Sequence, residues 1–413
     1  MRLVRLDSIR EEMELARDIP SAVLGALPLL RRGVRLSASL ADRLAARGVR
    51  AVWIEDGLGD GIIPAQPLPD HVRRSTEQAV GTCLRAARSA AGGIAGLPTS
   101  ALVQIEDAAA GILNALANCP EAALALDDLA SADSYTYSHS VRVATLGLLL
   151  GQRINRLDGW IDWRGRRRYD RSAERMTELA MGLLIHDIGK ISIPESVLNK
   201  PAKLTSEEWD LIKTHPSAGA SMLSADRASA LTICVVRDHH ERWDGLGYER
   251  GRTGSDTHQF ARIAAVADVY DAITADRPYK PANAPHVGVR VVREGAGSQF
   301  DPGVVEHFLR VVMPYPVGYS IATPSGRPAV VAGVNAERPE RPLVRYHDES
   351  GHIREAVMQV VDGEVRDPAL PAGDEPAAGR PLPETTDQQP GGVPDHRPAT
   401  GGSLRELDGT ATR

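Results

Sequence analysis

A short stretch near the middle of the chain decides the fold: MGLLIHDIGK at residues 181–190, an apolar run that leads into a His-Asp pair. Helical spacing extends over 173–187, so His186 and Asp187 are expected at the inner end of a core helix. A single histidine on an apolar face is usually a core residue with satisfied hydrogen bonds. The pair therefore gains meaning only from the other side chains that point into the same interior.

Helical spacing recurs on both sides of this stretch, over 71–91, 100–118, 136–152, 206–224, 227–241 and 260–275. His215 follows Leu211 by four residues and therefore shares its inward face. His239 and His240 stand in the same relation to the two valines at 235 and 236. Asp268 and Asp271 lie in an alanine-rich helix, where small neighbours leave space for something bulky.

Several helices thus aim imidazoles or carboxylates at one interior, as do helical bundles that bind metals. Burying so many polar groups without a metal would leave unsatisfied groups that each cost roughly 1–3 kcal/mol. The residues alone therefore predict a metal site in the helical region. A charged, capped start is expected for the helix over 206–224, since Thr205 and Glu208 form a capping-box pattern.

Composition limits the class of protein. The chain has 413 residues and a net charge of −6, which argues against a general nucleic-acid binder such as a DNA-binding protein. Its three cysteines form no CxxC pair, which favours a reduced, cytoplasmic protein. No apolar run of about 18 residues exists, so no membrane span is expected.

The pattern predicts a mainly α protein: a helical bundle with a small N-terminal α+β unit and a small C-terminal β unit. The expected parts are an α+β domain at 1–56, a linker with helices at 57–130, a catalytic domain at 131–313, a β domain at 314–366 and a disordered tail at 367–413. In the first part we expect a strand over 23–30, a helix capped by Ser39 and a strand over 49–54. In the β domain we expect strands over 320–323, 329–334, 343–346 and 357–361.

Residues 131–313 resemble an HD-GYP domain, the phosphodiesterase branch of the HD superfamily. The matching motifs are DSYTYSHS at 133–140, HDIGK at 186–190, IPESVLNKPAKLTSEEW at 193–209, HP at 215–216, HHERWDGLGY at 239–248, ARIAAVADVYDAITADRPYK at 261–280 and GSQFDP at 297–302. The resemblance implies an HD-type helical bundle that binds two divalent metals. The mixed imidazole and carboxylate donors favour iron or manganese and leave nickel and zinc as alternatives.

The resemblance also implies the ligands. One metal would take His139, His186, Asp187 and Asp268, and the other would take Asp187, His215, His239 and His240. A shared carboxylate holds two cations about 3.5–4 Å apart, an arrangement suited to in-line phosphoryl displacement. Some relatives bind a third metal through a Glu four residues before the first histidine. Tyr135 stands there in this chain, which favours two metals.

The same resemblance assigns Lys190 and Asp187 to catalysis, and Lys190, Arg277, Lys280 and Tyr248 to substrate binding. A lysine beside the His-Asp pair can offset charge that develops on a phosphate. The alternative to substrate binding by Arg277 and Lys280 is that they form a solvated pair on the surface.

The chain departs from the family in the motif that names it, because Glu249 stands where the proline of Gly-Tyr-Pro is expected. A second expected proline, after an isoleucine, is replaced in Thr257-His258. Proline fixes φ, so its loss predicts a more mobile loop on the substrate side. The basic segment over 153–175, with Trp160 and Trp163, is either a solvated loop or a basic lip that attracts a dinucleotide.

The function implied by the resemblance is hydrolysis of cyclic di-GMP to linear pGpG, with further cleavage to GMP left open. Two alternatives stand beside it: a phosphohydrolase of another nucleotide, which the altered loop motivates, and a catalytically weak cyclic-dinucleotide sensor. A complete ligand set argues against a pure sensor. Expected partners besides the substrate are a diguanylate cyclase, docking near Tyr248, or a second copy of the chain as a homodimer.

Overall fold

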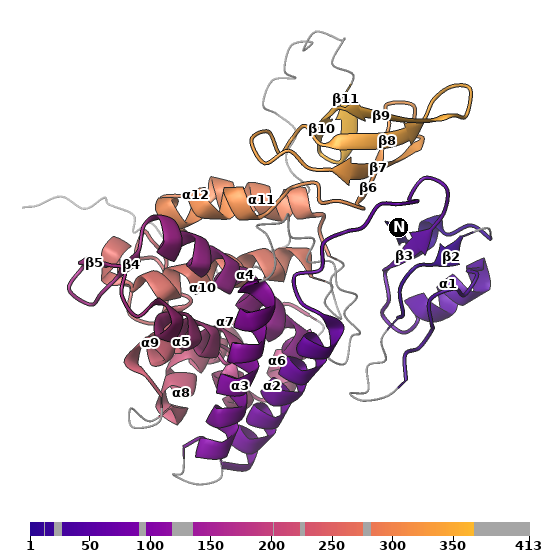
Figure 1. The fold of residues 1–413 in the computed structure, drawn as a ribbon. Helices are drawn as coiled ribbons and strands as arrows, with labels where there is room; N and C mark the ends of the chain where they lie inside the picture. The colour runs from indigo at the N-terminus through magenta and orange to yellow at the C-terminus, as the bar shows by residue number, and fades with distance from the viewer. Residues whose placement is uncertain are drawn as a thin grey trace, which may run out of the picture.

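Figure 1 shows a helical bundle with a small α+β unit and a six-stranded β unit beside it. The computed structural model describes residues 1–11, 13–19, 27–90, 96–117, 135–200, 202–223, 228–275 and 282–366. The predicted fold class, mainly α with a small unit at each end, is confirmed. Among the described helices, none combines the length and the apolar character that a membrane span requires.

The bundle is built mainly from helices. In chain order they are α2 (Asp70–Ala90), α3 (Thr99–Ala117), α4 (Tyr135–Leu157), α5 (Ser172–Leu184), η3 (Ile188–Ser192), α6 (Glu195–Leu198), α7 (Ser206–Ile212), α8 (His215–Met222), α9 (Ala230–Asp238), η4 (Gly254–Asp256), α10 (Gln259–Thr274), α11 (Pro285–Glu294) and α12 (Pro302–Val311). Helix α4 is central and packs on α2, α5, α10 and α12. The core consists mostly of Ala, Leu, Val and Ile, as the low aromatic content requires.

The single helix expected over 206–224 is wrong, because the chain breaks it into α7 and α8. Thr205 caps α7 with the predicted capping box. Pro216 stands in the first turn of α8, and a proline can neither donate a backbone hydrogen bond nor fit inside a continuing helix. His215 is therefore the first residue of α8 rather than an interior residue.

The N-terminal unit is a three-stranded sheet in the order β1-β3-β2, formed by β1 (Arg2–Arg5), β2 (Glu14–Leu15) and β3 (Ala51–Glu55), with α1 (Ala38–Ala45) and η1 (Leu6–Ser8). Ser37, not Ser39, caps α1, since its extended backbone lets its side chain accept the Leu40 N–H. Residues 20–26 of the expected strand lie outside the described residues, and 27–30 hold only a single bridge from Leu30 to Ile19.

The C-terminal unit contains three of the four predicted strands, those over 320–323, 329–334 and 343–346, and three more. They are β6 (Ser320–Ala322), β7 (Pro328–Gly333), β8 (Leu343–His347), β9 (Ile353–Val357), β10 (Gln359–Val361) and β11 (Glu364–Arg366), in the sheet order β10-β11-β6-β7-β8-β9. The run expected as one strand over 357–361 divides between β9 and β10. β11 pairs parallel with β6, whereas the other pairs are antiparallel.

The two end units contact each other. The Leu3 N–H donates to the Gly318 carbonyl oxygen at 2.8 Å, and Leu58 and Ile62 form an apolar cluster with Val330. Helices α2 and α3 share the core of the bundle with α4. The domain boundaries stay predictions, and the tail from 367 onward lies outside the described residues.

Gly189 sets the distance between η3 and α8. A Cβ at this position would lie 1.9 Å from the carbonyl oxygen of His215 and 2.5 Å from the backbone nitrogen of Gly219. Backbone atoms cannot move aside as a flexible side chain can. Gly189→Ala should therefore lower the free energy of unfolding by about 1–3 kcal/mol. Because α8 begins with His215, it should also weaken binding of divalent metal, measured by thermal unfolding and metal titration.

Gly111→Ala is the matched control. Gly111 lies in α3, and an added Cβ would meet its nearest neighbour, a Val72 methyl carbon, at 3.9 Å. Alanine in a helix interior is more stable than glycine by roughly 0.5–1 kcal/mol. The control should raise the melting temperature slightly and leave metal binding unchanged. An unchanged melting temperature and metal affinity in Gly189→Ala would contradict the close approach.

Candidate metal centre

Three histidines of the candidate site follow the ends of three helices and are oriented in the same way. His186 follows α5, His215 follows α7 and His239 follows α9. Each places its Nδ1 on the backbone carbonyl oxygen three residues earlier, at 2.8, 2.7 and 2.9 Å respectively. A carbonyl only accepts, so each Nδ1 carries the hydrogen and each Nε2 keeps its lone pair. Helix ends supply such unpaired carbonyls, so the backbone itself fixes these rings.

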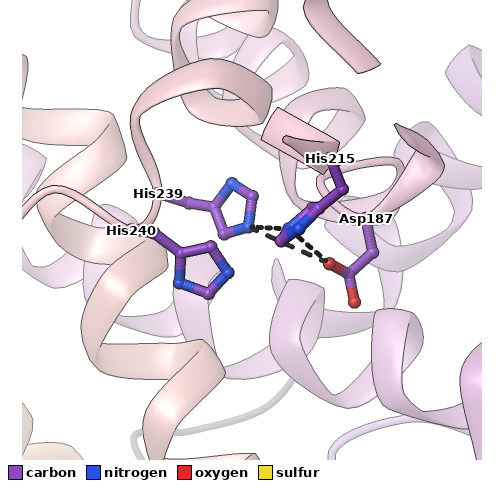
Figure 2. A group of neighbouring side chains, drawn as sticks. All are labelled: Asp187, His215, His239 and His240. Atoms are coloured by element: carbon purple, nitrogen blue, oxygen red, sulfur yellow. Dashed lines mark hydrogen bonds and ion pairs between the residues drawn. The ribbon is translucent and has the colours of Figure 1, made fainter. Parts of the chain in front are cut away.

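The carboxylate of Asp187 lies between two sets of imidazoles. Its Oδ1 is 3.3 Å from His215 Nε2 and 3.9 Å from His239 Nε2. Figure 2 shows that the side chains of Asp187 and His215 face those of His239 and His240, which come from the end of α9. The other carboxylate oxygen, Asp187 Oδ2, is 3.7 Å from His139 Nε2 and 3.5 Å from His186 Nε2. One carboxylate therefore faces both sets, each with a different oxygen.

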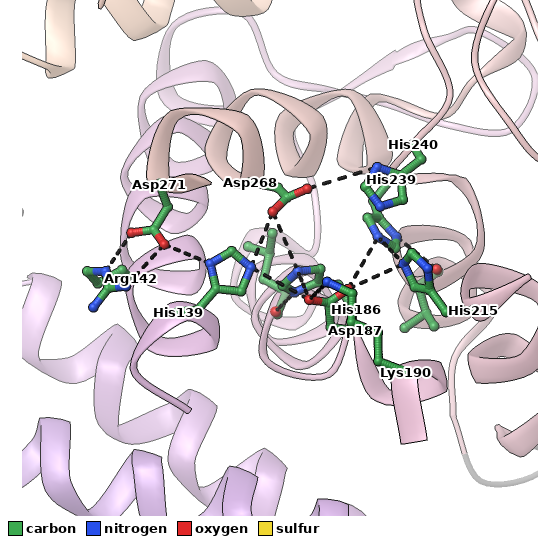
Figure 3. A network of polar contacts seen from close by, with 12 residues as sticks. His139, Arg142, His186, Asp187, Lys190, His215, His239, His240, Asp268 and Asp271 are labelled. Atoms are coloured by element: carbon green, nitrogen blue, oxygen red, sulfur yellow. Dashed lines mark hydrogen bonds and ion pairs between the residues drawn. The ribbon is translucent and has the colours of Figure 1, made fainter. Parts of the chain in front are cut away.

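Asp268, from the middle of α10, closes the other side of the site. Its Oδ1 lies 3.2 Å from His139 Nε2 and 3.9 Å from His186 Nε2. Its Oδ2 lies 4.0 Å from His240 Nδ1. Figure 3 shows the resulting network, in which α10 and the turn after α5 contribute the two carboxylates. Asp187 and Asp268 thus flank His139 and His186.

The donor atoms form two groups whose members lie within 4.8 Å of one another: Asp187, His215, His239 and His240 in one, and His139, His186 and Asp268 in the other. The structure thus brings together all seven residues expected as ligands. His186 Nε2 and Asp187 Oδ1 are buried and accept or donate no hydrogen bond among the described residues. Buried orphan donors and acceptors of this kind suit a cation, so the residues fit the metals that the sequence implied.

Asp271 lies behind His139, on the ring nitrogen that faces away from the donor groups. Its Oδ2 lies 2.7 Å from His139 Nδ1, and its Oδ1 accepts from Arg142 Nε at 2.5 Å. All three side chains are buried. A carboxylate on the outer nitrogen fixes the ring and raises its basicity toward a metal. Sequence reasoning missed Arg142, although it follows His139 by three residues and shares its helix face.

The electrostatics of the site follow from burial and neighbouring charge. Burial favours neutral Asp187, but Lys190 and the neighbouring imidazoles hold the pKa of this carboxyl well below its usual value. Burial and the nearby His186 and His215 lower the pKa of His239 to about 3, which leaves this ring neutral. Burial opposes protonation of His139, yet Asp268 and Asp271 raise its pKa to about 9. A proton and a cation therefore compete for its Nε2.

The residues expected to bind substrate are only partly described. Lys190 Nζ donates to Asp187 Oδ2 at 2.6 Å and is 37% exposed, so the ammonium lies at the edge of the site. The Tyr248 ring lies 4.8 Å from the His240 ring, between centroids. Burial, with the charges of Asp268 and Asp187, raises the pKa of its hydroxyl, which stays neutral. Arg277 and Lys280 lie outside the described residues.

The loop with the altered motif is anchored by Glu241, a buried side chain whose carboxylate accepts the backbone N–H groups of Arg250 and Arg252 at 2.7 and 3.0 Å. Glu249 itself is exposed. His258 caps α10, with its Nδ1 accepting the Phe260 N–H. These hydrogen bonds restrain the loop, and the sequence did not predict them. The greater mobility expected for the loop stays a prediction.

The basic segment forms a hairpin of β4 (Trp160–Ile161) and β5 (Arg167–Arg168). Five of its arginines pair with acidic side chains: Arg166 with Asp162, Arg167 with Asp158, Arg168 with Asp170, Arg171 with Glu174 and Arg175 with Glu178. Trp160 is buried and donates its indole N–H to the Asp170 carbonyl oxygen. The pairing favours a solvated loop over a basic lip.

Known proteins share both the domain and much of the chain. Residues 149–304 match the family model described as an HD domain. The chain is 34% identical over 362 residues to the cyclic di-GMP phosphodiesterase PA4108 of Pseudomonas aeruginosa, a match that covers 81% of this chain and 83% of that protein. The chain therefore belongs to the HD-GYP family of metal-dependent HD-domain phosphodiesterases.

Two relatives from Vibrio cholerae match a smaller part of the chain. A cyclic di-GMP phosphodiesterase is 46% identical over 134 residues, covering 31% of this chain and 27% of that protein. A 3'3'-cGAMP-specific phosphodiesterase 2 is 36% identical over 128 residues, covering 30% of this chain and 24% of that protein. The relatives are thus named for different cyclic dinucleotides, cyclic di-GMP in one case and 3'3'-cGAMP in the other.

Replacing Asp271 by Asn tests how His139 is positioned. The amide keeps the shape but loses the charge that orients His139 and balances Arg142. Metal affinity should fall about 10–100-fold, as it does when outer-shell partners are removed. Titration of Mn(II) against a competing chelator measures the change.

Asp158→Asn makes the same chemical change at a His-Asp pair on the surface, because Asp158 Oδ2 lies 2.7 Å from His307 Nε2 outside the two donor groups. Its Mn(II) affinity should match that of the wild type. If Asp271→Asn also binds Mn(II) as the wild type does, the positioning role is wrong.

Proposed function

We propose that this protein hydrolyses cyclic di-GMP to linear pGpG with two divalent metals bound in the two donor groups. The observation that carries the proposal is Asp187, whose two carboxylate oxygens face separate groups of imidazoles. Further support comes from the relative named a cyclic di-GMP phosphodiesterase, which aligns with 81% of this chain.

In this proposal, one metal is held by His139, His186, Asp187 and Asp268, and the other by Asp187, His215, His239 and His240. The mixture of imidazole and carboxylate donors suits iron or manganese. When bound, two such cations would supply Lewis-acid stabilisation of the phosphoryl group and activation of the nucleophile. The neutral state of His239 and the free Nε2 lone pairs favour this use.

The chain's own residues would hold and orient the substrate. Lys190 is half-exposed beside Asp187, so its ammonium can turn to a phosphate oxygen once cations balance the carboxylate. Tyr248, neutral and next to His240, offers a ring and a hydroxyl to the substrate. Arg277 and Lys280 are proposed as further phosphate contacts from the family resemblance alone.

A second candidate is hydrolysis of another cyclic dinucleotide, such as 3'3'-cGAMP. The observation that favours it is Glu249, an exposed acid in place of the proline of the family motif. A relative with 36% identity over 128 residues bears the name of a 3'3'-cGAMP-specific enzyme. A sensor without turnover is less well supported, since binding alone needs no such set of donors.

Four further expectations from the sequence stay predictions. They are a cytoplasmic location, a partner cyclase, a homodimer and the cleavage of pGpG to GMP.

The proposal is tested by loading the protein separately with Fe(II) and Mn(II) and incubating it with cyclic di-GMP, 3'3'-cGAMP and pGpG. Chromatography of the products should show pGpG from cyclic di-GMP with at least one metal. Asp187→Ala, which removes the shared carboxylate, should lose both the metal and the activity. Asp170→Ala, at an exposed hairpin position, should keep both. Turnover of 3'3'-cGAMP alone would transfer the proposal to the second candidate, and binding without any product would support the sensor.

A further inference from the structure

A chain of aromatic rings leads outward from the candidate metal centre. The Tyr248 ring lies 4.8 Å from His240, and the Trp209 ring lies 6.3 Å from Tyr248 at an interplanar angle of 80°. Neither Tyr248 nor Trp209 is fully buried. Tyr248 thus contacts His240 of the donor groups, and Trp209 in turn contacts Tyr248.

The helix that carries Trp209 is held in place by contacts within the chain. Glu208, the residue before it, closes the capping box by accepting the Thr205 N–H at 2.8 Å. The same carboxylate accepts from Lys200 Nζ at 2.6 Å. A platform that is already ordered loses little entropy when a ligand stacks on it.

The other tryptophans have different surroundings. Trp53 lies under the guanidinium of Arg17, Trp160 is buried in the hairpin, and Trp243 lies under the guanidinium of Arg262. Trp163 is 56% exposed and packs on His258. His258 precedes Asp268 by ten residues along α10, which is about 15 Å of helix. Among the described tryptophans, Trp209 is therefore the one linked by ring contacts to the donor groups.

We propose that one purine base of the cyclic dinucleotide stacks on the indole of Trp209, with the nearly perpendicular Tyr248 ring at the edge of this surface. This inference rests on the proposed function and deepens it, because it assigns the base-binding subsite. Every base offers a π-face, and stacking on an aromatic side chain contributes roughly 1–3 kcal/mol per base. A flat indole at the edge of the site would hold the base while the phosphodiester lies at the donor groups.

The test compares Trp209→Leu, Trp209→Phe and Trp163→Leu in metal-loaded full-length protein. Loss of the indole should raise KM for cyclic di-GMP about tenfold with little change in kcat, because stacking holds the base and not the reacting phosphate. Phenylalanine should restore most of the affinity. Hydrolysis of bis(4-nitrophenyl) phosphate, which has no purine, should be unchanged in Trp209→Leu, and so should metal content and melting temperature.

Equilibrium binding of cyclic di-GMP, measured by calorimetry on the same variants, separates this inference from the proposed function. If the wild type binds but does not turn over cyclic di-GMP, the proposed function fails, while weaker binding by Trp209→Leu still supports the stacking surface. Equal affinity in Trp209→Leu and wild type overturns the inference. So does a loss of affinity confined to Trp163→Leu, which would place the base at the hairpin.

Discussion

The structure depends on a buried carboxylate, that of Asp187. Burial alone would drive this group to its neutral form, yet Lys190 and the surrounding imidazoles keep its pKa well below the usual value. A buried charge of this kind is tolerated only where partners compensate it on every side. Helix α4, the ends of α5 and α9, and the start of α8 meet at this point, and each brings an imidazole to the carboxylate.

The partners are aimed by the ends of helices. A helix leaves its last carbonyl groups without N–H donors, and three imidazoles of the site take up such carbonyls. The same hydrogen bond that satisfies the backbone turns Nε2 toward Asp187. His139 differs because it lies within α4, where the carbonyls are used, and it relies on Asp271 instead. Rigid rings, placed by backbone and carboxylate, are what a metal site requires.

The sequence was sufficient for the helical fold, because a 3.6-residue spacing tells which face of a helix is inward. The seven donor residues that the structure brings together were implied by the resemblance to the HD-GYP family, not by spacing alone. It was insufficient for the ends of the helices, which decide how His186 and His215 point. Pro216 was an available signal for the break between α7 and α8. The contacts of Asp271 with Arg142 and of Trp209 with Tyr248 join residues far apart in the chain, so no local pattern predicts them.

The central claim is that Asp187 lies between two bound cations. The most direct measurement is anomalous diffraction at the metal absorption edge from crystals of Mn(II)-loaded protein. The account predicts two peaks about 3.5–4 Å apart, one on each side of the Asp187 carboxylate. A single peak, or two peaks that do not share Asp187, would contradict it.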